Sequence, residues 1–284
     1  MHQEHSIKSL EALLGAGRDS RDRFGVNAWF RGQADSEWPL RPKVARPEIT
    51  DQSRRLEFED AMARKFMRRA RTRHTKVPRD DEFPAWLFLM QHYGLPTRLL
   101  DWSESLLIAA YFAVCDQRKW DRPGVIWALA PHVLNKSIVG TEMNITAHDS
   151  VGQLAANLPF MRDAYEKMNE EYRETAERLA RGIVALEPDE VDLRMLLQQS
   201  VFTIHGSLIE DESMAFPETC LIKYLIPSGM KETFAHALAC AGIRRSTVFP
   251  DLDNLATELR HESSRSSTAA AEQANPAAGA SRRR

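Results

Sequence analysis

The sequence predicts an α+β fold, in which helices wrap a mixed or antiparallel sheet and one segment forms a charged helical insertion. Extended and helical segments are interspersed without the clean βαβ repeat of a doubly wound sheet. Hydrophobic residues make up 43% of the 284 residues, which is enough for a core of normal size. A polar segment follows the last apolar helix. We therefore expect one domain over residues 1–261 and a tail over residues 262–284.

The predicted strands are short segments rich in β-branched and aromatic residues, bounded by glycine, proline or polar residues. They cover Val26–Gln33, Gly124–Ala130, Gly182–Leu186, Ser200–His205 and Cys220–Ile226. The alternation of side chains in the first of them indicates a half-buried strand. These segments are expected to form the sheet.

A long amphipathic helix is predicted from Gln52 to His74, with an acidic start and a basic end that suit the helix dipole. Its apolar stripe recurs every four residues, at Phe58, Met62, Phe66 and Ala70. Two strongly apolar helices are expected at Pro84–Tyr93 and Ser103–Ala113. Further helices are a short one capped by Ser6 and ending at Gly15 or Gly17, and two over residues 230–241 and 251–258.

Two segments are expected to lie outside this core. Residues 154–180 are charged and helical, with opposite charges four residues apart such as Arg173 and Glu177, and we interpret them as an insertion. Residues 262–284 consist mainly of serine, alanine and arginine. Because such a segment buries too little apolar surface to offset its ordering entropy, we expect it to be disordered.

Composition excludes several classes of function. The formal charge of −2 provides no general basic field for nucleic acid, although the basic helix end from Arg64 to Arg73 leaves a local contact open. The three cysteines and nine histidines show no metal-binding spacing, so no metal is expected. No signal peptide is visible and no uncharged run approaches ~18 residues. We expect a cytoplasmic protein without membrane contact.

Arg31 is the first candidate for a functional residue. It stands in a predicted strand, where an arginine is poorly suited unless a planar anionic group holds its guanidinium. Gly32 after it permits the close approach of a ligand or of another strand. The same pattern suits a structural arginine paired with a buried carboxylate, and spacing alone leaves the two interpretations equal.

The second candidate is the segment from Gln91 to Trp102 (QHYGLPTRLLDW), which we interpret as a loop between two apolar helices. It gathers more polar and aromatic groups than such a connection needs, and loops on rigid elements often carry binding residues. Asp101 could instead cap the following helix, and Arg98 could form a structural ion pair with it. We expect Arg31, Gln33, Arg98 and Asp101 to converge on one concavity.

Several segments together resemble the FRG domain family, which takes its name from a Phe-Arg-Gly motif. They are Trp29–Gln33, Trp38–Pro42, Gln91–Trp102, Ala109–Ala113, Gln198–Thr203 and Phe249–Leu252. The resemblance covers about residues 5–260 and is most specific over the segment from Gln91 to Trp102. It implies a bacterial or phage setting, such as phage defence or a toxin system, but names no substrate.

A weaker resemblance is to the ADP-ribosyltransferases. An aromatic-Arg-Gly strand, followed by a strand with a hydroxyl residue that leads into a helix, is similar to the first two signature elements of those enzymes. The resemblance implies that Arg31 holds the diphosphate or nicotinamide ribose of NAD and that Ser103, or Ser105, takes the serine place. Tyr93 or Trp102 would then offer a stacking face.

The third signature element of those enzymes is a glutamate, which opposes positive charge on the ribose as the glycosidic bond breaks. Here the matching segment carries Gln198 and Gln199, and an amide has no charge for this task. The predicted catalytic residues are therefore Arg31, Ser103 and Gln199, and whether the chain catalyses a reaction is left open.

These observations predict a protein that binds a small phosphorylated ligand, NAD or another nucleotide, with ADP-ribosyl transfer or NAD hydrolysis as the enzymatic version. The expected ligand-binding residues are Arg31, Gly32, Gln33, His92, Tyr93, Arg98, Asp101 and Trp102. The alternative is a non-catalytic recognition or sensor module that binds nucleic acid or a protein partner.

Overall fold

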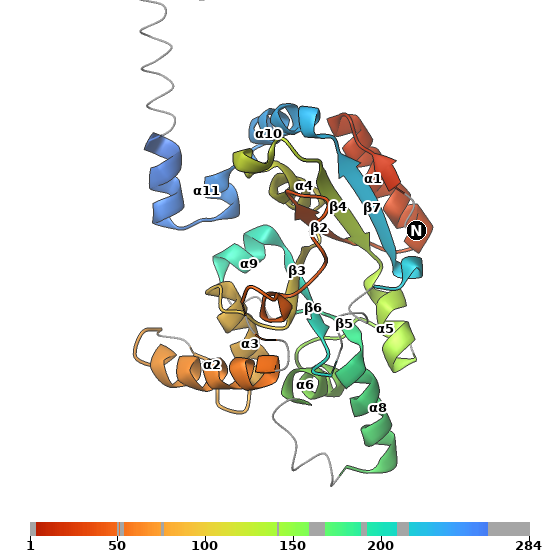
Figure 1. Cartoon of the computed structure of the whole chain (residues 1–284), viewed down its shortest axis with the longest axis vertical. Coiled ribbons are helices and arrows are strands. Elements are labelled where there is room, and N and C mark those ends of the chain that lie inside the picture. Colours follow the sequence, from red (N-terminus) through yellow and green to blue (C-terminus); the bar gives the residue numbers. More distant parts are fainter. Residues whose placement is uncertain are drawn as a thin grey trace, which may run out of the picture.

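A single seven-stranded sheet forms the centre of the molecule. The structure is a computed structural model of the chain and describes residues 4–49, 51, 54–74, 77–140, 142–158, 168–188, 192–208 and 216–260. The strands are β1 (Glu4–Ser6), β2 (Trp29–Gln33), β3 (Leu99–Ser103), β4 (Gly124–Leu129), β5 (Ile183–Leu186), β6 (Ser200–His205) and β7 (Leu221–Ile226). Their order is β1-β7-β4-β2-β3-β6-β5 (Figure 1). Only β1 pairs in parallel with its neighbour, so the predicted mixed α+β fold is confirmed.

The sheet separates at its centre, between β2 and β3. These strands share one residue pair, Phe30 with Ser103, whereas β2 pairs with β4 over five residues and β3 pairs with β6 over five. The sheet is therefore two ladders joined at one point. Beyond this point β2 and β3 diverge, so their facing backbone N–H and C=O groups cannot form hydrogen bonds with each other.

Helix α4 (Leu106–Val114) covers β2 on one face of the sheet, with α1 (Leu10–Phe24) and α10 (Lys231–Cys240) beside it. A Cβ atom on Gly32 would lie 1.7 Å from the backbone oxygen of Ala109, so only glycine permits this contact. The backbone that approaches Gly32 therefore belongs to a helix, and not to another strand.

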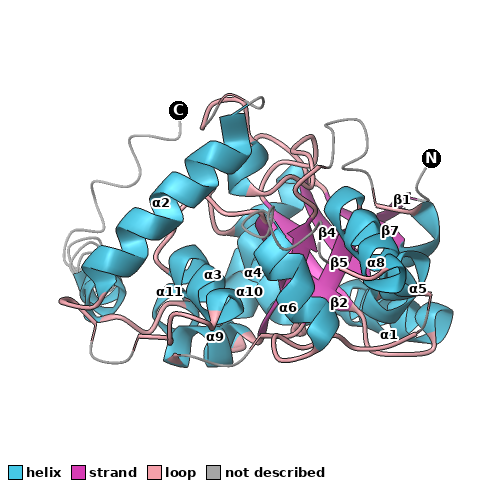
Figure 2. Ribbon diagram, turned by 90° about the horizontal axis from the view of Figure 1, so that it is seen from below, coloured by secondary structure: helices cyan, strands magenta, loops and turns pink. Residues whose placement is uncertain are grey.

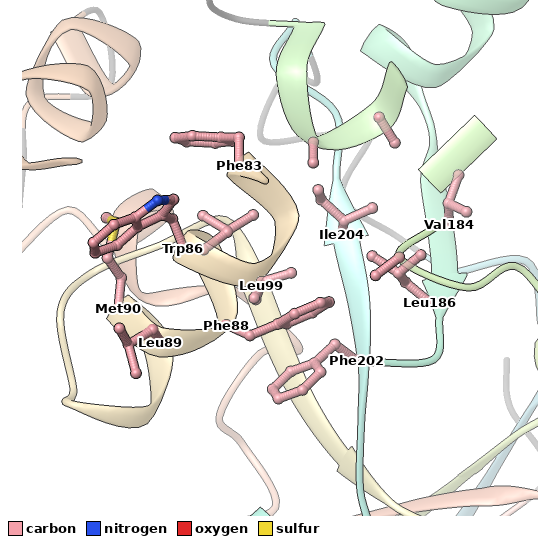
Figure 3. Packing of buried hydrophobic residues seen from close by; sticks show 14 of the residues in the cluster. Phe83, Trp86, Phe88, Leu89, Met90, Leu99, Val184, Leu186, Phe202 and Ile204 are labelled. Atoms are coloured by element: carbon pink, nitrogen blue, oxygen red, sulfur yellow. The ribbon is translucent and has the colours of Figure 1, made fainter. Parts of the chain in front are cut away.

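The part of the sheet formed by β3, β5 and β6 packs against α3 (Phe83–His92), α6 (Ser150–Asn157) and α8 (Glu170–Arg181). Figure 3 shows the apolar side chains of α3 lying against those of β3 and β6, where the rings of Phe88 and Phe202 are 5.2 Å apart. The predicted insertion contains α8, whose buried face carries Ala176, Leu179 and Ala180. This part of the insertion thus contributes to the core, while residues 159–167 and the predicted tail lie outside the described residues.

The opposite face of the sheet carries an aromatic cluster under α5 (Pro131–Val139) and a short 3-10 helix, η1 (Lys43–Ala45). Trp29, Trp102 and Trp127 come from three strands and are all buried. Side chains alternate along a strand, so residues two apart in β2 share a face. Arg31 and Gln33 therefore start from the same face as Trp29.

Helix α2 (Arg55–Ala70) extends along one edge of the molecule, close to α3 (Figure 2). Its buried residues include Glu59, whereas the predicted stripe residues Phe58, Met62 and Phe66 are only partly buried. Glu59 accepts hydrogen bonds from Arg98, from the backbone nitrogen at 3.1 Å and from Nη1 at 3.2 Å. Arg98 Nη2 also donates to the Ala156 backbone oxygen. A buried ion pair thus joins α2 to the start of β3.

Several predicted boundaries were wrong. The segment from Gln91 to Trp102 is not one loop, because Leu99–Ser103 forms β3. Helix α4 consequently begins at Leu106 with Ser105 as its cap, and Asp101 caps no helix there. Helix α1 is capped by Ser9 and continues to Phe24, where Gly25 ends it with a φ of 73°. No helix of the described residues is long and apolar enough to cross a membrane.

The Glu59–Arg98 pair gives a direct test of how α2 is held. Because the side chains are 2% and 4% exposed, Glu59→Leu strands the Arg98 charge and should lower the free energy of unfolding by about 3–5 kcal/mol. The double variant Glu59→Leu, Arg98→Met removes both charges and should recover most of that loss. Denaturant midpoints of the three proteins measure both effects. A single variant within ~1 kcal/mol of wild type would contradict a buried pair.

Candidate functional site

A cleft of about 210 Å³ opens where β2 and β3 separate. It lies against α4 and the end of α9 (Leu193–Gln198). Its lining residues are Phe30, Arg31, Gly32, Asp101, Trp102, Ser103, Ile108, Ala109, Phe112, Gln198 and Ser200. One wall is therefore apolar and aromatic, and the other carries an arginine, a carboxylate and hydroxyl groups.

Arg31 bridges the two halves of the sheet at this cleft. Its Nη1 donates a 2.6 Å hydrogen bond to the backbone oxygen of Asp101 and lies 3.9 Å from the Asp101 carboxylate. The buried Nε has no hydrogen-bond partner among the described residues. Burial lowers the pKa of the Arg31 guanidinium; the Asp101 carboxylate opposes this shift and Arg46 adds to it. Arg31 is thus a desolvated cation whose donors are only partly used.

The Asp101 carboxylate is held in a fixed orientation at the mouth of the cleft. Gln91 Nε2 donates to both of its oxygens, at 2.9 and 3.0 Å, and Gln91 Oε1 accepts a 2.5 Å bond from Thr97 Oγ1. The Asp101 side chain remains 57% exposed. A carboxylate that is both oriented and accessible can accept hydrogen bonds from a ligand.

Ser103 lies two residues further along β3 and also lines the cleft. Its Oγ donates to the backbone oxygen of Gln198 at 2.6 Å and accepts from the Ser105 nitrogen at 3.0 Å. Gln198 lines the cleft and donates to the Val248 backbone oxygen. Gln199, the predicted catalytic residue, is instead exposed at the end of α9 with a φ of 46°. The neighbouring Gln198 therefore occupies the place expected for Gln199.

Only part of the expected convergence occurs. Arg31 and Asp101 meet, but Gln33 is buried, with Nε2 bound to the Pro39 oxygen and Oε1 bound to Trp127 Nε1. Arg98 is engaged by Glu59 in the interior, as described above. Neither Gln33 nor Arg98 lines the cleft. The expectation failed for these two because their side chains already have partners inside the fold.

His92 and Tyr93 also lie outside the cleft lining. His92 Nδ1 is 2.8 Å from a carboxylate oxygen of Asp192, and its ring meets that of Tyr93 edge-on at 4.8 Å. Burial lowers the pKa of His92 more than Asp192 raises it. Trp102 does line the cleft, with its indole nitrogen bound to Thr203 Oγ1, and Gly32 lines it beneath α4.

His205 is buried at the end of β6, and neither of its ring nitrogens has a hydrogen-bond partner among the described residues. Burial, reinforced by Arg55 and Arg31, lowers the pKa of His205 to about 3. It lines a cavity of about 10 Å³ together with Glu59 and Arg98. No sequence motif marks it, because the strand pattern is the same for a paired histidine.

The described residues contain no group of three or more His, Cys, Asp or Glu side chains that could hold a metal. In comparisons with known proteins, residues 26–122 match the model of the FRG domain. No curated protein and no solved structure matches the chain. The matched range contains Arg31, Asp101, Ser103 and the whole of α4.

Replacement of Arg31 should have a moderate effect on stability. Arg31→Ala removes a hydrogen bond between a charged donor and the Asp101 carbonyl, so the free energy of unfolding should fall by about 1.5–3 kcal/mol. The loss should be smaller than for Glu59→Leu, because the Asp101 carboxylate is exposed and water can solvate it. Denaturant midpoints without ligand measure both variants. An equal or larger loss for Arg31→Ala would show a purely structural arginine.

His205 should make the protein less stable in acid. Its native pKa of about 3 lies below its unfolded value of about 6.5, so the unfolded state binds more protons between these values. Stability due to this residue is complete above pH 6.5 and should fall by about 1.4 kcal/mol per pH unit below it. Urea titrations from pH 7 to 4 should show this slope in wild type, and a smaller slope in His205→Phe. The exposed His236→Phe is the control, and equal slopes in both variants would contradict the assignment.

Proposed function

We propose that this chain, which carries an FRG domain and so belongs to the FRG domain family, binds a small phosphorylated ligand of the nucleotide class in the cleft between β2, β3 and α4. The observation that supports the proposal is the state of Arg31. A guanidinium that is desolvated, with a buried Nε lacking a partner among the described residues, is a strong donor for an anionic group. Because Arg31 lines the cleft and its side chain is 15% exposed, a phosphate oxygen can accept a hydrogen bond from the accessible part of the guanidinium.

The size of the cleft limits what it can hold. Pockets for whole drug-sized ligands have volumes of about 300–1,000 Å³, whereas this one has about 210 Å³. It therefore suits one part of a nucleotide, such as a sugar ring with its phosphate. Phe30, Ile108 and Phe112 offer apolar and aromatic surface to the faces of such a ring.

Asp101 supplies the acceptor that a sugar requires. It is the only carboxylate that lines the cleft among the residues described, and Ser103 lines the same cleft. Carboxylates commonly hold ribose hydroxyls in nucleotide sites. Arg31 for phosphate and Asp101 for hydroxyl groups would together select a sugar phosphate over inorganic phosphate.

NAD is the ligand for which this arrangement also offers a reaction. In cleavage of its glycosidic bond, the C1′–N bond breaks and its electron pair leaves with nicotinamide, while water or an acceptor hydroxyl adds to the ribose carbon and loses a proton. Asp101 would oppose the positive charge that develops on the ribose, the task expected of a glutamate in ADP-ribosyltransferases. The amide of Gln198 cannot do so.

A non-catalytic recognition module is the second candidate, and one surface favours it. The solvent side of α2 and the turn after it expose Arg64, Lys65, Arg68, Arg69, Arg71 and Arg73. Arg64 and Arg71 are paired with Asp60 and Asp80, which reduces the net charge of this surface. Salt-dependent binding of a labelled single-stranded RNA, lost in a Lys65, Arg68, Arg69 triple glutamine variant, would support this candidate instead.

Calorimetric titration with NAD, AMP and ribose 5-phosphate tests the proposed cleft. Arg31→Lys keeps the charge but loses the planar fork, so binding should weaken by about 1.5–3 kcal/mol while the fold persists. Asp101→Asn should weaken binding of all three ligands, and Arg64→Gln is the control on α2. Release of nicotinamide from NAD, absent in Asp101→Asn, would identify the enzymatic version. Binding that neither cleft variant alters would place the ligand elsewhere.

A further inference from the structure

We propose that Arg194 and Arg245 form a second phosphate subsite at the rim of the cleft, so that the preferred ligand carries a diphosphate, as in a nucleoside diphosphate or a dinucleotide. The proposal rests on the proposed function of the cleft and names the ligand class more closely. Its basis is a pair of arginines that the fold holds in place and that have no carboxylate oxygen within 4 Å among the described residues.

Both arginines are positioned by one aromatic ring, Phe249. The guanidinium carbon of Arg194 lies 4.8 Å from the ring centroid, and that of Arg245 lies 6.0 Å from it. Arg194 comes from α9 and Arg245 from α11 (Arg245–Val248), which lie beside each other in Figures 1 and 2. Stacking on an aromatic ring orients a guanidinium while its N–H groups stay available at the edge.

The Phe249 ring packs against a residue that lines the cleft. Phe249 meets Phe112 edge-on with centroids 6.0 Å apart, and Phe112 lines the cleft. Gln198 lines the cleft as well and donates a 2.9 Å bond to the oxygen of Val248, the residue before Phe249. Arg194 precedes Gln198 by four residues, so both lie on one face of α9. The two guanidinium groups therefore stand one aromatic ring away from the cleft.

Among the described residues, no carboxylate oxygen lies within 4 Å of either guanidinium, and Asp251 interacts with Arg194 only at longer range. Arg194 donates only a long 3.5 Å bond to the His92 oxygen, and Arg245 Nε donates to the side-chain oxygen of Asn254. The Asp251 carboxylate accepts hydrogen bonds from the backbone nitrogen and Nδ2 of Asn254, which hold its orientation and leave its charge in place. Two oriented cations with spare donors suit a phosphoryl group.

The small volume of the cleft supports the same ligand class. If a sugar ring occupies the space beside Arg31 and Asp101, a phosphate chain longer than one group must extend out of it. The rings of Phe112 and Phe249 connect this space to the guanidinium groups of Arg194 and Arg245. The inner phosphate or sugar would then contact Arg31, and the outer phosphate would contact the rim.

Calorimetric titration with AMP and ADP tests the proposal on the full chain. Wild type should bind ADP roughly tenfold more tightly than AMP, because the outer phosphate gains a charge-assisted contact. Arg194→Gln and Arg245→Gln should each reduce that ratio towards one and leave the affinity for AMP unchanged. Phe249→Leu should act in the same direction because it removes the platform, and Arg64→Gln on α2 is the matched control.

The outcomes separate the rim from the cleft. Equal affinities of wild type for AMP and ADP, or a ratio that survives both rim variants, would overturn the rim subsite while leaving the cleft proposal standing. A loss of AMP binding in Asp101→Asn but not in the rim variants would support both. If neither nucleotide binds wild type, both proposals fail together. Equal weakening of AMP and ADP by the rim variants would show that these arginines support the fold and not the outer phosphate.

Discussion

The hydrogen bond from Arg31 Nη1 to the backbone oxygen of Asp101 joins the two halves of the sheet. Strands β2 and β3 pair at one point only, so beyond that point the carbonyl of Asp101 has no backbone partner on β2. An unpaired buried carbonyl is costly, and a guanidinium can replace the missing strand donor. The cleft exists because a side chain, and not a ladder of backbone bonds, closes the sheet here.

The separation of the strands also explains why so many groups with binding capacity meet at one place. α4 contacts β2 closely enough to require Gly32, while β3 diverges beneath it and presents Asp101 and Ser103 on one face. Strands therefore supply Arg31, Asp101 and Ser103, and helix α4 supplies the apolar residues Ile108, Ala109 and Phe112. Rigid elements hold both walls, which favours a preformed site over one that a mobile loop completes.

The side chains of Arg98 and Arg31 differ in how their charges are compensated. Arg98 is buried with Glu59, and the pair joins α2, β3 and α6 without contact with the cleft. Arg31 is also desolvated, but its nearest carboxylate is exposed and its Nε lacks a partner among the described residues. A neutralised pair supports structure, whereas an incompletely satisfied cation can bind a ligand. This difference is the physical basis for assigning Arg98 to the scaffold and Arg31 to the candidate site.

The sequence alone determined the α+β class and five of the seven strands in outline, because hydrophobic period and residue type are local properties. It also singled out Arg31 and the segment that ends at Trp102 as candidates for a site. Its residue pattern predicted a loop over Leu99–Trp102, where only the weaker resemblance implied a strand, since that assignment depends on pairing with β6. Nor could it tell which polar side chains would find partners: Gln33 and Arg98 do so inside the fold, and His205 does not within the described residues. Those outcomes depend on residues distant in sequence, such as Trp127 and Glu59, and only tertiary packing brings them together.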